Sequence, residues 1–394
     1  MKAIILAAGK GTRMMPLTQK RPKPLLEIAN KPILEYDLDA LHGLVDEVLI
    51  VVGYKKETIM KYFGTKYKGM KLTYIIQKDV CGTGNAVLQC EPFVKGSFLV
   101  MNGDDIYPRK AMKDCLKPKY SILGQEVTDP EKFGVLKTKG KCLDCIVEKP
   151  KKFVSNLANT NLHKVDDSVF SILKNMKKST RGEYEFVDAV TELAKKEKVT
   201  CVVTKEWRPV GYPWHLLEAN EFFLGKIKNK RQGRIEKGVV IKGNVVIGKN
   251  TIIKSGVYME GNIIIGENCK IGPNCFIRGS TAIGNNCHIG QAVEIKNSLI
   301  GAGSNVPHLS YVGDSIIGEN VNFGAGSIVA NLRHDNANMK TVINGKLIGT
   351  GRRKLGAIVG DDVHLGINTI IYPGRKIYAE KTTLPGEIIK KDVV

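Results

Sequence analysis

Residues 235–296 read IEKGVV IKGNVV IGKNTI IKSGVY MEGNII IGENCK IGPNCF IRGSTA IGNNCH IGQAVE IK, with an aliphatic residue opening every block of six. These residues are Ile235, Ile241, Ile247, Ile253, Met259, Ile265, Ile271, Ile277, Ile283, Ile289 and Ile295. The register shifts and continues at Ile300, Val306, Val312, then at Ile317, Phe323, Val329, and after an insertion at Val359, Leu365, Ile371 and Ile377. A six-residue period predicts a parallel β-helix, in which each repeat supplies one side of a coil and one inward aliphatic side chain.

The residue four positions after each aliphatic residue is mostly small and predicts a second inward row. This row contains Val239, Val245, Thr251, Val257, Ile263, Cys269, Cys275, Thr281, Cys287 and Val293. Its three cysteines are expected to act as small buried hydrophobes, with a metal or redox role as the alternative. The pair Cys142 and Cys145 is an isolated CxxC motif and also favours a structural interpretation over zinc or thiol redox chemistry.

The N-terminal part of the chain has a different pattern. Short apolar runs, KAIILAAG, EVLIVVG, KLTYIIQ and GSFLVMNGD, alternate with amphipathic stretches. This alternation predicts an α/β domain with a mostly parallel sheet, whose strand ends carry ligand loops. We expect this domain over residues 1–225, a helical connector over 213–230, a linker at 226–234 and the β-helix over 235–394.

Composition restricts the class of protein. The chain has 394 residues, 43% of them hydrophobic and 25% charged, and it contains no apolar run of membrane-spanning length. Its net charge of +21 fits nucleic acid, an anionic membrane, small polyanionic substrates or a solvated surface. The lysines are dispersed, so we expect neither nucleic acid nor a membrane as partner. Nine cysteines without paired spacing, and no recognisable targeting signal, predict a cytoplasmic protein.

A glycine-rich loop directly follows the first predicted strand. Residues 6–26 read LAAGKGTRMMPLTQKRPKPLL, and backbone amides of such a loop can bind phosphate oxygens. This run resembles the signature of the sugar-1-phosphate nucleotidyltransferase family, which makes nucleotide sugars from a nucleoside triphosphate and a sugar-1-phosphate. The resemblance implies catalytic roles for Arg13 and Lys23. The nucleotide contacts that it implies here are Leu6, Ala8, Gly9, Gly11 and Thr12.

More of this family's pattern follows in order. Gln77, Gly82 and Thr83 match its base contacts, and Asp104 matches its Mg²⁺ ligand. Its sugar-phosphate contacts fall on Gly134, Glu148, Lys149 and Asn159. The resemblance implies in-line attack of a sugar phosphate oxygen on the α-phosphorus with release of pyrophosphate, a reaction that depends on positioning and neutralising charge.

One departure concerns a second metal ligand. Relatives often have an Asp or Asn near the end of this domain, but residues 207–215 contain no carboxylate. His215 is expected to cap or pack the connector helix rather than to bind metal.

Residues 294–340 resemble the acetyltransferase half of the bacterial bifunctional enzyme that acetylates glucosamine-1-phosphate and then uridylylates it. The resemblance implies that His308 is the general base, a role that suits a histidine near neutral pH. It places Arg278 and Lys296 on the sugar phosphate, where cations suit a dianion. The other amino-sugar contacts fall on Tyr311, Asn322 and Asn331, with Ala325 on the acetyl-CoA side. Ile367 replaces a serine near coenzyme A, and basic residues of the insertion are candidates to meet its phosphates.

Together these features predict an α/β, Rossmann-like nucleotidyltransferase domain followed by a left-handed β-helix, the hand being implied by the resemblance. The chain looks like an archaeal bifunctional sugar-1-phosphate nucleotidylyltransferase/acetyltransferase. The expected cofactor is Mg²⁺, acetyl-CoA is the expected co-substrate, and the expected assembly is a homotrimer. One alternative is a single-activity pyrophosphorylase whose β-helix serves assembly or regulation. Another is a non-catalytic relative, like subunits of the eukaryotic translation-factor exchange complex. The choice between UTP and dTTP and between glucosamine and galactosamine stays open.

Overall fold

The computed structural model describes residues 1–78, 81–179 and 181–394, which form two compact units. The first unit consists of Met1–Lys10, Pro22–Leu25 and Ile33–Pro209. The second consists of Gly11–Arg21, Leu26–Pro32 and Val210–Val394. None of the helices in these described ranges is long and apolar enough to span a membrane.

A ten-stranded sheet forms the centre of the first unit, in the order β10-β11-β13-β9-β12-β7-β1-β4-β6-β5. Its strands are β1 Lys2–Ala7, β4 Glu47–Val52, β5 Lys66–Tyr67, β6 Met70–Ile76, β7 Ser97–Asn102, β9 Tyr120–Glu126, β10 Gly134–Lys139, β11 Cys142–Glu148, β12 Leu157–Asp166 and β13 Val199–Thr204. The four strands predicted from apolar runs are β1, β4, β6 and β7, and they pair in parallel. The α/β prediction is therefore confirmed, although β10, β11 and β12 add antiparallel pairings. A short pair, β8 Asp105–Ile106 and β14 Arg208–Pro209, lies outside this sheet.

Alternating side chains of β1 point into two separate cores, as expected for a strand that is covered on both faces. Ala3 and Ile5 join a core formed with α1 Ile33–Leu41, α2 Lys56–Phe63 and α4 Arg109–Cys115. Ile4 joins the opposite core, with α3 Thr83–Leu88, α5 Ser168–Asn175 and α6 Phe186–Ala194. Helices thus cover both faces of the parallel strands, which leaves the carboxyl ends of these strands for ligand loops.

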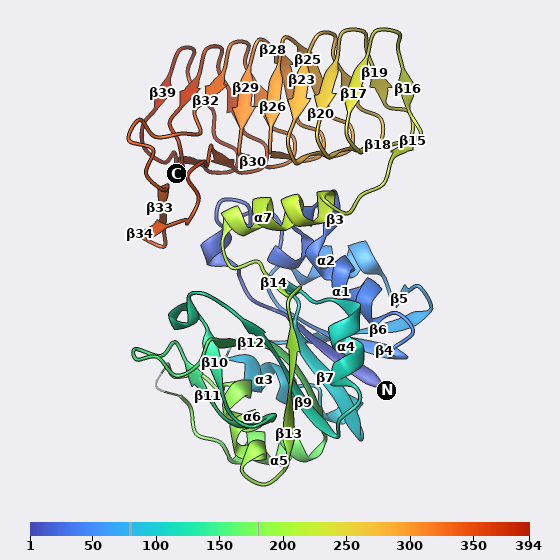
Figure 1. Ribbon diagram of the computed structural model, residues 1–394, viewed down its shortest axis with the longest axis vertical. Helices are drawn as coiled ribbons and strands as arrows, with labels where there is room; N and C mark the ends of the chain where they lie inside the picture. The colour runs from blue at the N-terminus through green and yellow to red at the C-terminus, as the bar shows by residue number, and fades with distance from the viewer. Residues whose placement is uncertain (79–80, 180) are drawn as a thin grey trace. The chain divides into compact units, whose positions relative to one another are not determined.

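The second unit is dominated by a three-sided parallel β-helix, whose coils stack in one column in Figure 1. Face 1 contains β15 Lys230–Arg231, β18 Val245–Ile247, β21 Ile263–Ile265, β24 Thr281–Ile283, β27 Leu299–Ile300, β30 Ile316–Ile317, β35 Ile358–Val359 and β38 Lys376–Ile377. Face 2 contains β16 Arg234–Ile235, β19 Ile252–Ile253, β22 Lys270–Ile271, β25 His288–Gln291, β28 Asn305–His308, β31 Asn322–Phe323 and β36 His364–Leu365. Face 3 contains β17 Val240–Lys242, β20 Tyr258–Glu260, β23 Phe276–Arg278, β26 Glu294–Lys296, β29 Tyr311–Gly313, β32 Ile328–Val329, β37 Ile370–Ile371 and β39 Ile388–Ile389.

The two predicted inward rows form the core of this β-helix. Every aliphatic residue of the six-residue register from Ile247 to Ile377 is buried, whereas Ile235 and Ile241 are only partly buried. Both lie in the first coil, which has no further coil beside it on one side. Cys269, Cys275 and Cys287 are buried in the same core. Their predicted role as small core residues is therefore confirmed.

Two boundaries differ from the prediction. The connector helix α7 covers Pro213–Leu224 and does not continue to residue 230, because the next residue, Gly225, is a poor helix former. The β-helix begins earlier than expected, since Lys230 and Arg231 already pair with Val246 and Ile247 of β18. Short elements complete the unit: β2 Glu27–Ile28, β3 Lys31–Pro32, and a hairpin of β33 Lys340–Ile343 and β34 Lys346–Gly349 within the insertion.

Candidate active sites

The first candidate site lies at the carboxyl ends of the parallel strands. Leu6 of β1 pairs with Asn102 of β7, and the Gly103 amide donates a hydrogen bond to the Leu6 carbonyl oxygen at 2.9 Å. The strand ends therefore lie side by side, with Ala8 and Asp104 a few residues beyond them. Gly9 is exposed, and a side chain there would meet no atom within 4 Å. The open backbone at Gly9 is what a phosphate-binding loop requires, because its amides must be accessible to phosphate oxygens.

Lys23 and Asp104 form an ion pair in the first unit, with the lysine Nζ 2.7 Å from Asp104 Oδ2. The Lys23 side chain is 7% exposed and that of Asp104 is 37% exposed. A single turn of 3-10 helix, Lys23–Leu25, positions the lysine. The pair combines a held ammonium group with an accessible carboxylate, which suits binding of polyphosphate together with a cation.

The residues present fit a Mg²⁺ ion that is shared with substrate. Such an ion keeps several waters and usually takes only one or two protein carboxylates besides substrate phosphates, and Asp104 offers one accessible carboxylate. Among the described residues, no cluster of three or more His, Cys, Asp or Glu side chains could hold a metal by itself. The second ligand expected in relatives is not replaced by His215, whose Nδ1 accepts a hydrogen bond from the Gly211 amide at 3.1 Å. This contact ties the first turn of α7 to the segment before it, which agrees with the expectation that His215 caps or packs the connector helix.

The predicted base contacts lie between β6 and α3. Gln77 is buried, and its Nε2 donates to the Gly82 carbonyl oxygen at 3.3 Å and to Asn85 Oδ1 at 3.1 Å. Gly82 has a φ of +102°, and a Cβ there would lie 2.4 Å from the Tyr184 carbonyl oxygen, so the turn requires glycine. The Thr83 hydroxyl accepts a hydrogen bond from the Phe186 amide at 2.9 Å. The structure thus brings these residues together, with the Thr83 hydroxyl engaged in holding α6.

The predicted sugar-phosphate contacts meet where β10, β11 and β12 pair. Gly134 lies opposite Glu148, and a Cβ at position 134 would lie 2.7 Å from Glu148 Oε2. Lys149 follows directly, with a φ of +44°. Asn159 is buried on β12, and its Oδ1 accepts the Asn161 amide at 2.9 Å. Gly134, Glu148 and Asn159 therefore belong to neighbouring strands, and Lys149 directly follows one of them.

The remaining predicted residues of the glycine-rich loop belong to the second unit. Gly11 has a φ of +62°, and its carbonyl oxygen accepts the Met14 amide at 2.9 Å. Thr12 begins a single 3-10 turn, Thr12–Met14. The Arg13 guanidinium lies over the Tyr212 ring, 5.4 Å from its centroid. A cation–π contact of this kind orients a guanidinium while leaving its N–H groups available.

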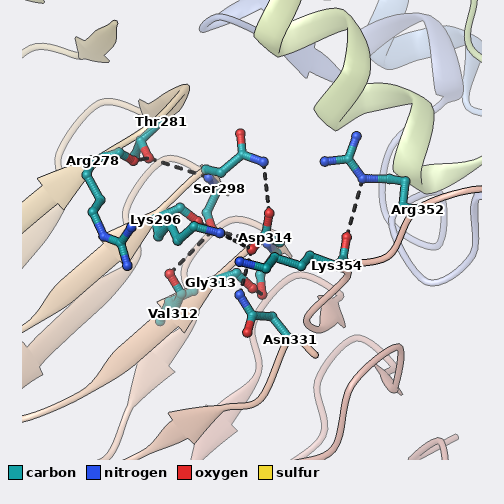
Figure 2. Close-up of polar contacts among 12 residues, drawn as sticks. Arg278, Thr281, Lys296, Ser298, Val312, Gly313, Asp314, Asn331, Arg352 and Lys354 are labelled. Carbon is teal, nitrogen blue, oxygen red and sulfur yellow. Dashed lines mark hydrogen bonds and ion pairs between the residues drawn. The ribbon is translucent and has the colours of Figure 1, made fainter. Parts of the chain in front are cut away.

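The second candidate site lies on face 3 of the β-helix and is drawn in Figure 2. Arg278, Lys296 and Gly313 occupy the same register position in three successive coils. Arg278 Nε donates to Glu294 Oε1 at 2.7 Å, which fixes its guanidinium on this face. The Tyr311 hydroxyl accepts a hydrogen bond from Asn331 Nδ2 at 3.1 Å. The structure therefore brings Arg278, Lys296, Tyr311 and Asn331 together, as the resemblance implied.

Asp314 joins these residues and was missed by the sequence analysis. Its Oδ2 accepts from Lys296 Nζ at 2.7 Å and from Asn331 Nδ2 at 2.6 Å. Burial of Tyr311, followed by the nearby carboxylates of Glu294 and Asp314, raises the pKa of the Tyr311 hydroxyl. The tyrosine therefore remains a neutral hydroxyl near neutral pH.

The other predicted acetyl-site residues lie on face 2. His308 is exposed at the end of β28, and its carbonyl oxygen accepts the Gly326 amide at 3.3 Å, which places Ala325 in the next coil. Asn322 lies on β31, in register with Asn305. Within the described part of the chain, no hydrogen bond joins these three residues to the cluster on face 3. The predicted set is therefore divided between two neighbouring faces, with His308 near their shared corner.

The insertion between β32 and β35 was expected to offer its basic residues to the phosphates of coenzyme A, and the structure limits which of them can do so. Arg352 NH2 donates to Glu221 Oε1 of α7 at 2.7 Å, and its side chain is 15% exposed. This guanidinium is already engaged within the unit, so Arg352 is a poor candidate to meet coenzyme A phosphates. Arg353 and Lys346 are exposed and remain the candidates from this segment.

Comparisons with known proteins identify the family to which the chain belongs. Residues 2–226 match the family described as "Nucleotidyl transferase", and residues 259–393 match "GMPPB C-terminal domain". A Methanococcus maripaludis protein named "Bifunctional protein GlmU" is 44% identical over 398 residues, covering 100% of this chain and 95% of the relative. A Sulfurisphaera tokodaii protein named "Bifunctional sugar-1-phosphate nucleotidylyltransferase/acetyltransferase" is 40% identical over 401 residues, covering 100% of this chain and 98% of the relative.

A solved structure supports the assignment of the first unit. A putative glucose-1-phosphate thymidylyltransferase from Bacillus anthracis, in complex with a sucrose, is 30% identical, with a TM-score of 0.53. The similarity covers 59% of this chain and 98% of that one. The chain therefore belongs to the nucleotidyl transferase family and, over its whole length, to the bifunctional sugar-1-phosphate nucleotidylyltransferase/acetyltransferases found in archaea.

Proposed function

We propose that this enzyme acetylates an amino-sugar-1-phosphate on its β-helix and transfers a nucleotidyl group to an acetylated sugar-1-phosphate at its N-terminal domain. The substrates are glucosamine-1-phosphate or galactosamine-1-phosphate with acetyl-CoA, and then UTP or dTTP. The observation that carries the bifunctional assignment is the polar cluster on face 3. A β-helix that served assembly alone would need no buried Lys296–Asp314 pair next to Tyr311 and Asn331.

In nucleotidyl transfer, the protein's task is to hold the triphosphate and the attacking phosphate in line and to balance their charge. The glycine-rich loop offers backbone amides, Lys23 offers a positioned ammonium, and Arg13 offers a guanidinium whose plane is set by Tyr212. Asp104 would hold Mg²⁺, which supplies charge neutralisation on the phosphate oxygens when bound. The sugar phosphate would lie against Gly134, Glu148, Lys149 and Asn159.

In acetyl transfer, the amine of the sugar attacks the thioester carbonyl and must lose a proton. His308 is the proposed general base, because histidine is the side chain best suited to accept a proton at neutral pH. The phosphate of the substrate would be held by Arg278 and Lys296, and the amino sugar by Tyr311, Asn322 and Asn331. The thioester would approach from the side of Ala325.

We further propose a homotrimer with left-handed coils, in which neighbouring copies meet on face 3. An exposed apolar row supports this assembly, because isolated monomers rarely present such a continuous row to water. The row runs in register along face 3 through Ile328, Ile370 and Ile388. Such packing would also bring the predicted acetyl-site residues of face 2 and face 3 next to a second copy of the chain.

We place the functional boundary of the first domain near residue 225, and we let the second domain begin with the first coil of the β-helix at Lys230–Arg231. The end of the nucleotidyl transferase match at residue 226 supports this division. We also infer a cytoplasmic location, which agrees with the free thiols of all nine cysteines.

The alternative is a single-activity pyrophosphorylase whose β-helix serves assembly or regulation. The match of residues 259–393 to "GMPPB C-terminal domain" favours it. The face 3 cluster and the full-length similarity to proteins named as bifunctional favour two activities.

A substrate panel tests the proposal. Each nucleoside triphosphate is combined with each sugar-1-phosphate and Mg²⁺, with and without acetyl-CoA, and products are identified by mass spectrometry. We expect a UDP- or dTDP-sugar with N-acetylglucosamine-1-phosphate, and an acetylated product from an amino-sugar-1-phosphate with acetyl-CoA. Nucleotide-sugar formation without any acetylated product would favour the pyrophosphorylase alternative.

A further inference from the structure

Asp314 is a buried carboxylate at the centre of the face 3 cluster. Its side chain is 4% exposed and that of Lys296 is 16% exposed. Three side-chain nitrogens donate to it: Lys296 Nζ at 2.7 Å, Asn331 Nδ2 at 2.6 Å and Asn297 Nδ2 at 2.9 Å. Figure 2 shows Lys296 and Asn331 converging on this residue. A carboxylate this well buried requires such partners.

The turn that carries Asp314 does not itself require an aspartate. In the first five coils the residue after the face 3 strand has a positive φ, and in three of them it is a glycine: Gly243, Gly261 and Gly279. In the two coils next to the candidate site, the glycine is replaced by Asn297 and Asp314, with φ of +45° and +48°. Glycine is the residue that adopts this conformation without cost. The side chain at position 314 is therefore retained for its contacts.

Its neighbour Gly313 shows the same adaptation to the cluster. The equivalent positions in earlier coils carry long charged side chains, among them Arg278 and Lys296. Gly313 does not have a left-handed φ, but a Cβ there would lie 2.4 Å from the Tyr311 hydroxyl oxygen and 2.6 Å from Asn331 Nδ2. Space is thus kept free for these two side chains to meet each other and for Asn331 to reach Asp314.

The contacts of Asp314 determine how Asn331 presents its amide. Asn331 Nδ2 donates to Asp314 Oδ2 and to the Tyr311 hydroxyl, which uses both of its hydrogens. Its Oδ1 then becomes the free acceptor, since it receives no hydrogen bond from the described residues. A substrate amine is a donor and needs such an acceptor. Lys296 gives one of its three hydrogens to Asp314 and keeps two for a phosphate.

We propose that Asp314 is a positioning residue of the acetyl-transfer site, which holds Lys296 toward the substrate phosphate and turns the Asn331 amide oxygen toward the substrate amine. This inference rests on the proposed acetyl-transfer function. Asp314 touches no substrate itself; it acts through the two side chains that do. Its loss weakens binding of the amino-sugar phosphate and leaves the acetyl-CoA side unchanged.

The test uses the full-length chain and the variant Asp314→Asn. Asparagine keeps the shape and tolerates the positive φ, but it offers one acceptor oxygen to three donors and no counter-charge to Lys296. Because hydrogen bonds to charged groups contribute about 1.5–3 kcal/mol, the KM for the amino-sugar phosphate should rise about 10- to 150-fold. The kcat and the KM for acetyl-CoA should change by about threefold at most, as expected when binding to substrate and transition state is weakened equally.

Two further variants separate positioning from folding. Asp314→Gly carries the residue that earlier coils use at this turn, so it keeps the backbone and should show the same rise in KM. Asn286→Gly is the control for the turn conformation, because Asn286 also has a positive φ, of +58°, but is exposed and lies between faces 1 and 2, away from the cluster; its KM should stay near that of wild type. Thermal unfolding and pyrophosphate release from N-acetylglucosamine-1-phosphate and UTP report on the integrity of each variant.

An unchanged KM for the amino-sugar phosphate in both Asp314 variants would overturn the inference while leaving the proposed acetyl transfer intact. An equal rise in Asn286→Gly would also overturn it, because the effect would then belong to a change of turn conformation and not to the carboxylate. A wild-type enzyme that releases no coenzyme A with either amino-sugar phosphate would instead refute the proposed function itself.

Discussion

Replacing Gly313 by alanine should inactivate the acetyl site through a single added methyl group. The new Cβ would lie 2.4 Å from the Tyr311 hydroxyl oxygen and 2.6 Å from Asn331 Nδ2, whereas ordinary contact begins at 3.4 Å. Tyr311 must therefore retreat by about 1 Å, and a displacement of about 1 Å in a site can cost on the order of 100-fold in rate. No backbone strain is added, because φ at Gly313 lies outside the left-handed region.

The fold should survive this change. Overpacking of a well-packed site costs about 1–3 kcal/mol, and Tyr311 is only half-buried, so its ring can move toward solvent. We therefore expect a modest fall in the unfolding temperature of the β-helix. Gly349→Ala is the matched control, since a Cβ at that exposed position in β34 would meet no atom within 4 Å.

The assay follows coenzyme A release with glucosamine-1-phosphate and galactosamine-1-phosphate, and pyrophosphate release in parallel. Gly313→Ala should lose about 100-fold in coenzyme A release while pyrophosphate release and the Gly349→Ala control stay near wild type. Retention of more than half of the acetyl-transfer rate by Gly313→Ala would show that Tyr311 and Asn331 do not form the site.

Three other outcomes are expected. Asp104→Ala should lower pyrophosphate release by about 100-fold or more at saturating Mg²⁺, with acetyl transfer retained; near-normal pyrophosphate release would remove Asp104 from the site. Burial raises the pKa of the Cys275 thiol to about 12, so mass spectrometry should find it unlabelled by a thiol reagent at pH 8 until unfolding, and rapid labelling in the folded protein would contradict its core position. Burial lowers the pKa of His163 to about 3, and because the unfolded chain then binds the proton more readily below pH 6.5, stability should fall by about 1.4 kcal/mol per pH unit from pH 6.5 toward pH 3. The free energy of unfolding of the first unit in His163→Leu, measured from pH 3 to pH 6.5, should lack this contribution. A pH dependence equal to that of the wild type would refute the assigned role of His163.

The repeating part of the fold was predictable because its determinants are local and periodic. The six-residue register located both inward rows, down to the burial of Cys275 and Cys287. The apolar runs likewise located β1, β4, β6 and β7. A strand between helices or an inward row in a β-helix is dictated by the spacing of its apolar residues, and that spacing is visible in one chain.

The helix end and the start of the β-helix were predicted less well. The apolar residues Phe222, Phe223 and Ile227 are compatible with a longer helix, and only the pairing of Lys230 and Arg231 with β18 shows that the first coil has begun. That pairing joins residues 16 positions apart and depends on how the coils stack. Tertiary contacts of this kind override local propensity.

Asp314 belongs to the candidate site, but neither the family resemblance nor a sequence motif pointed to it. It contacts Lys296 from the coil before and Asn331 from the coil after, so its role depends on the stacking of three coils. One signal was available in the sequence: the turn column of Gly243, Gly261 and Gly279 changes to Asn297 and Asp314 beside the predicted site residues. A departure from glycine at a position that favours it indicates a side chain kept for its contacts.

The most direct test of the central claim, that one chain carries two independent active sites, is a paired measurement on His308→Ala. His308 is exposed at the end of β28, so its truncation opens no core cavity and should leave folding intact. We predict that coenzyme A release from acetyl-CoA with an amino-sugar-1-phosphate falls by at least about 100-fold, within the range that general base catalysis contributes. Pyrophosphate release from N-acetylglucosamine-1-phosphate and UTP should stay near wild type. Full acetyl transfer by the variant, or parallel loss of both activities in a folded protein, would contradict the account.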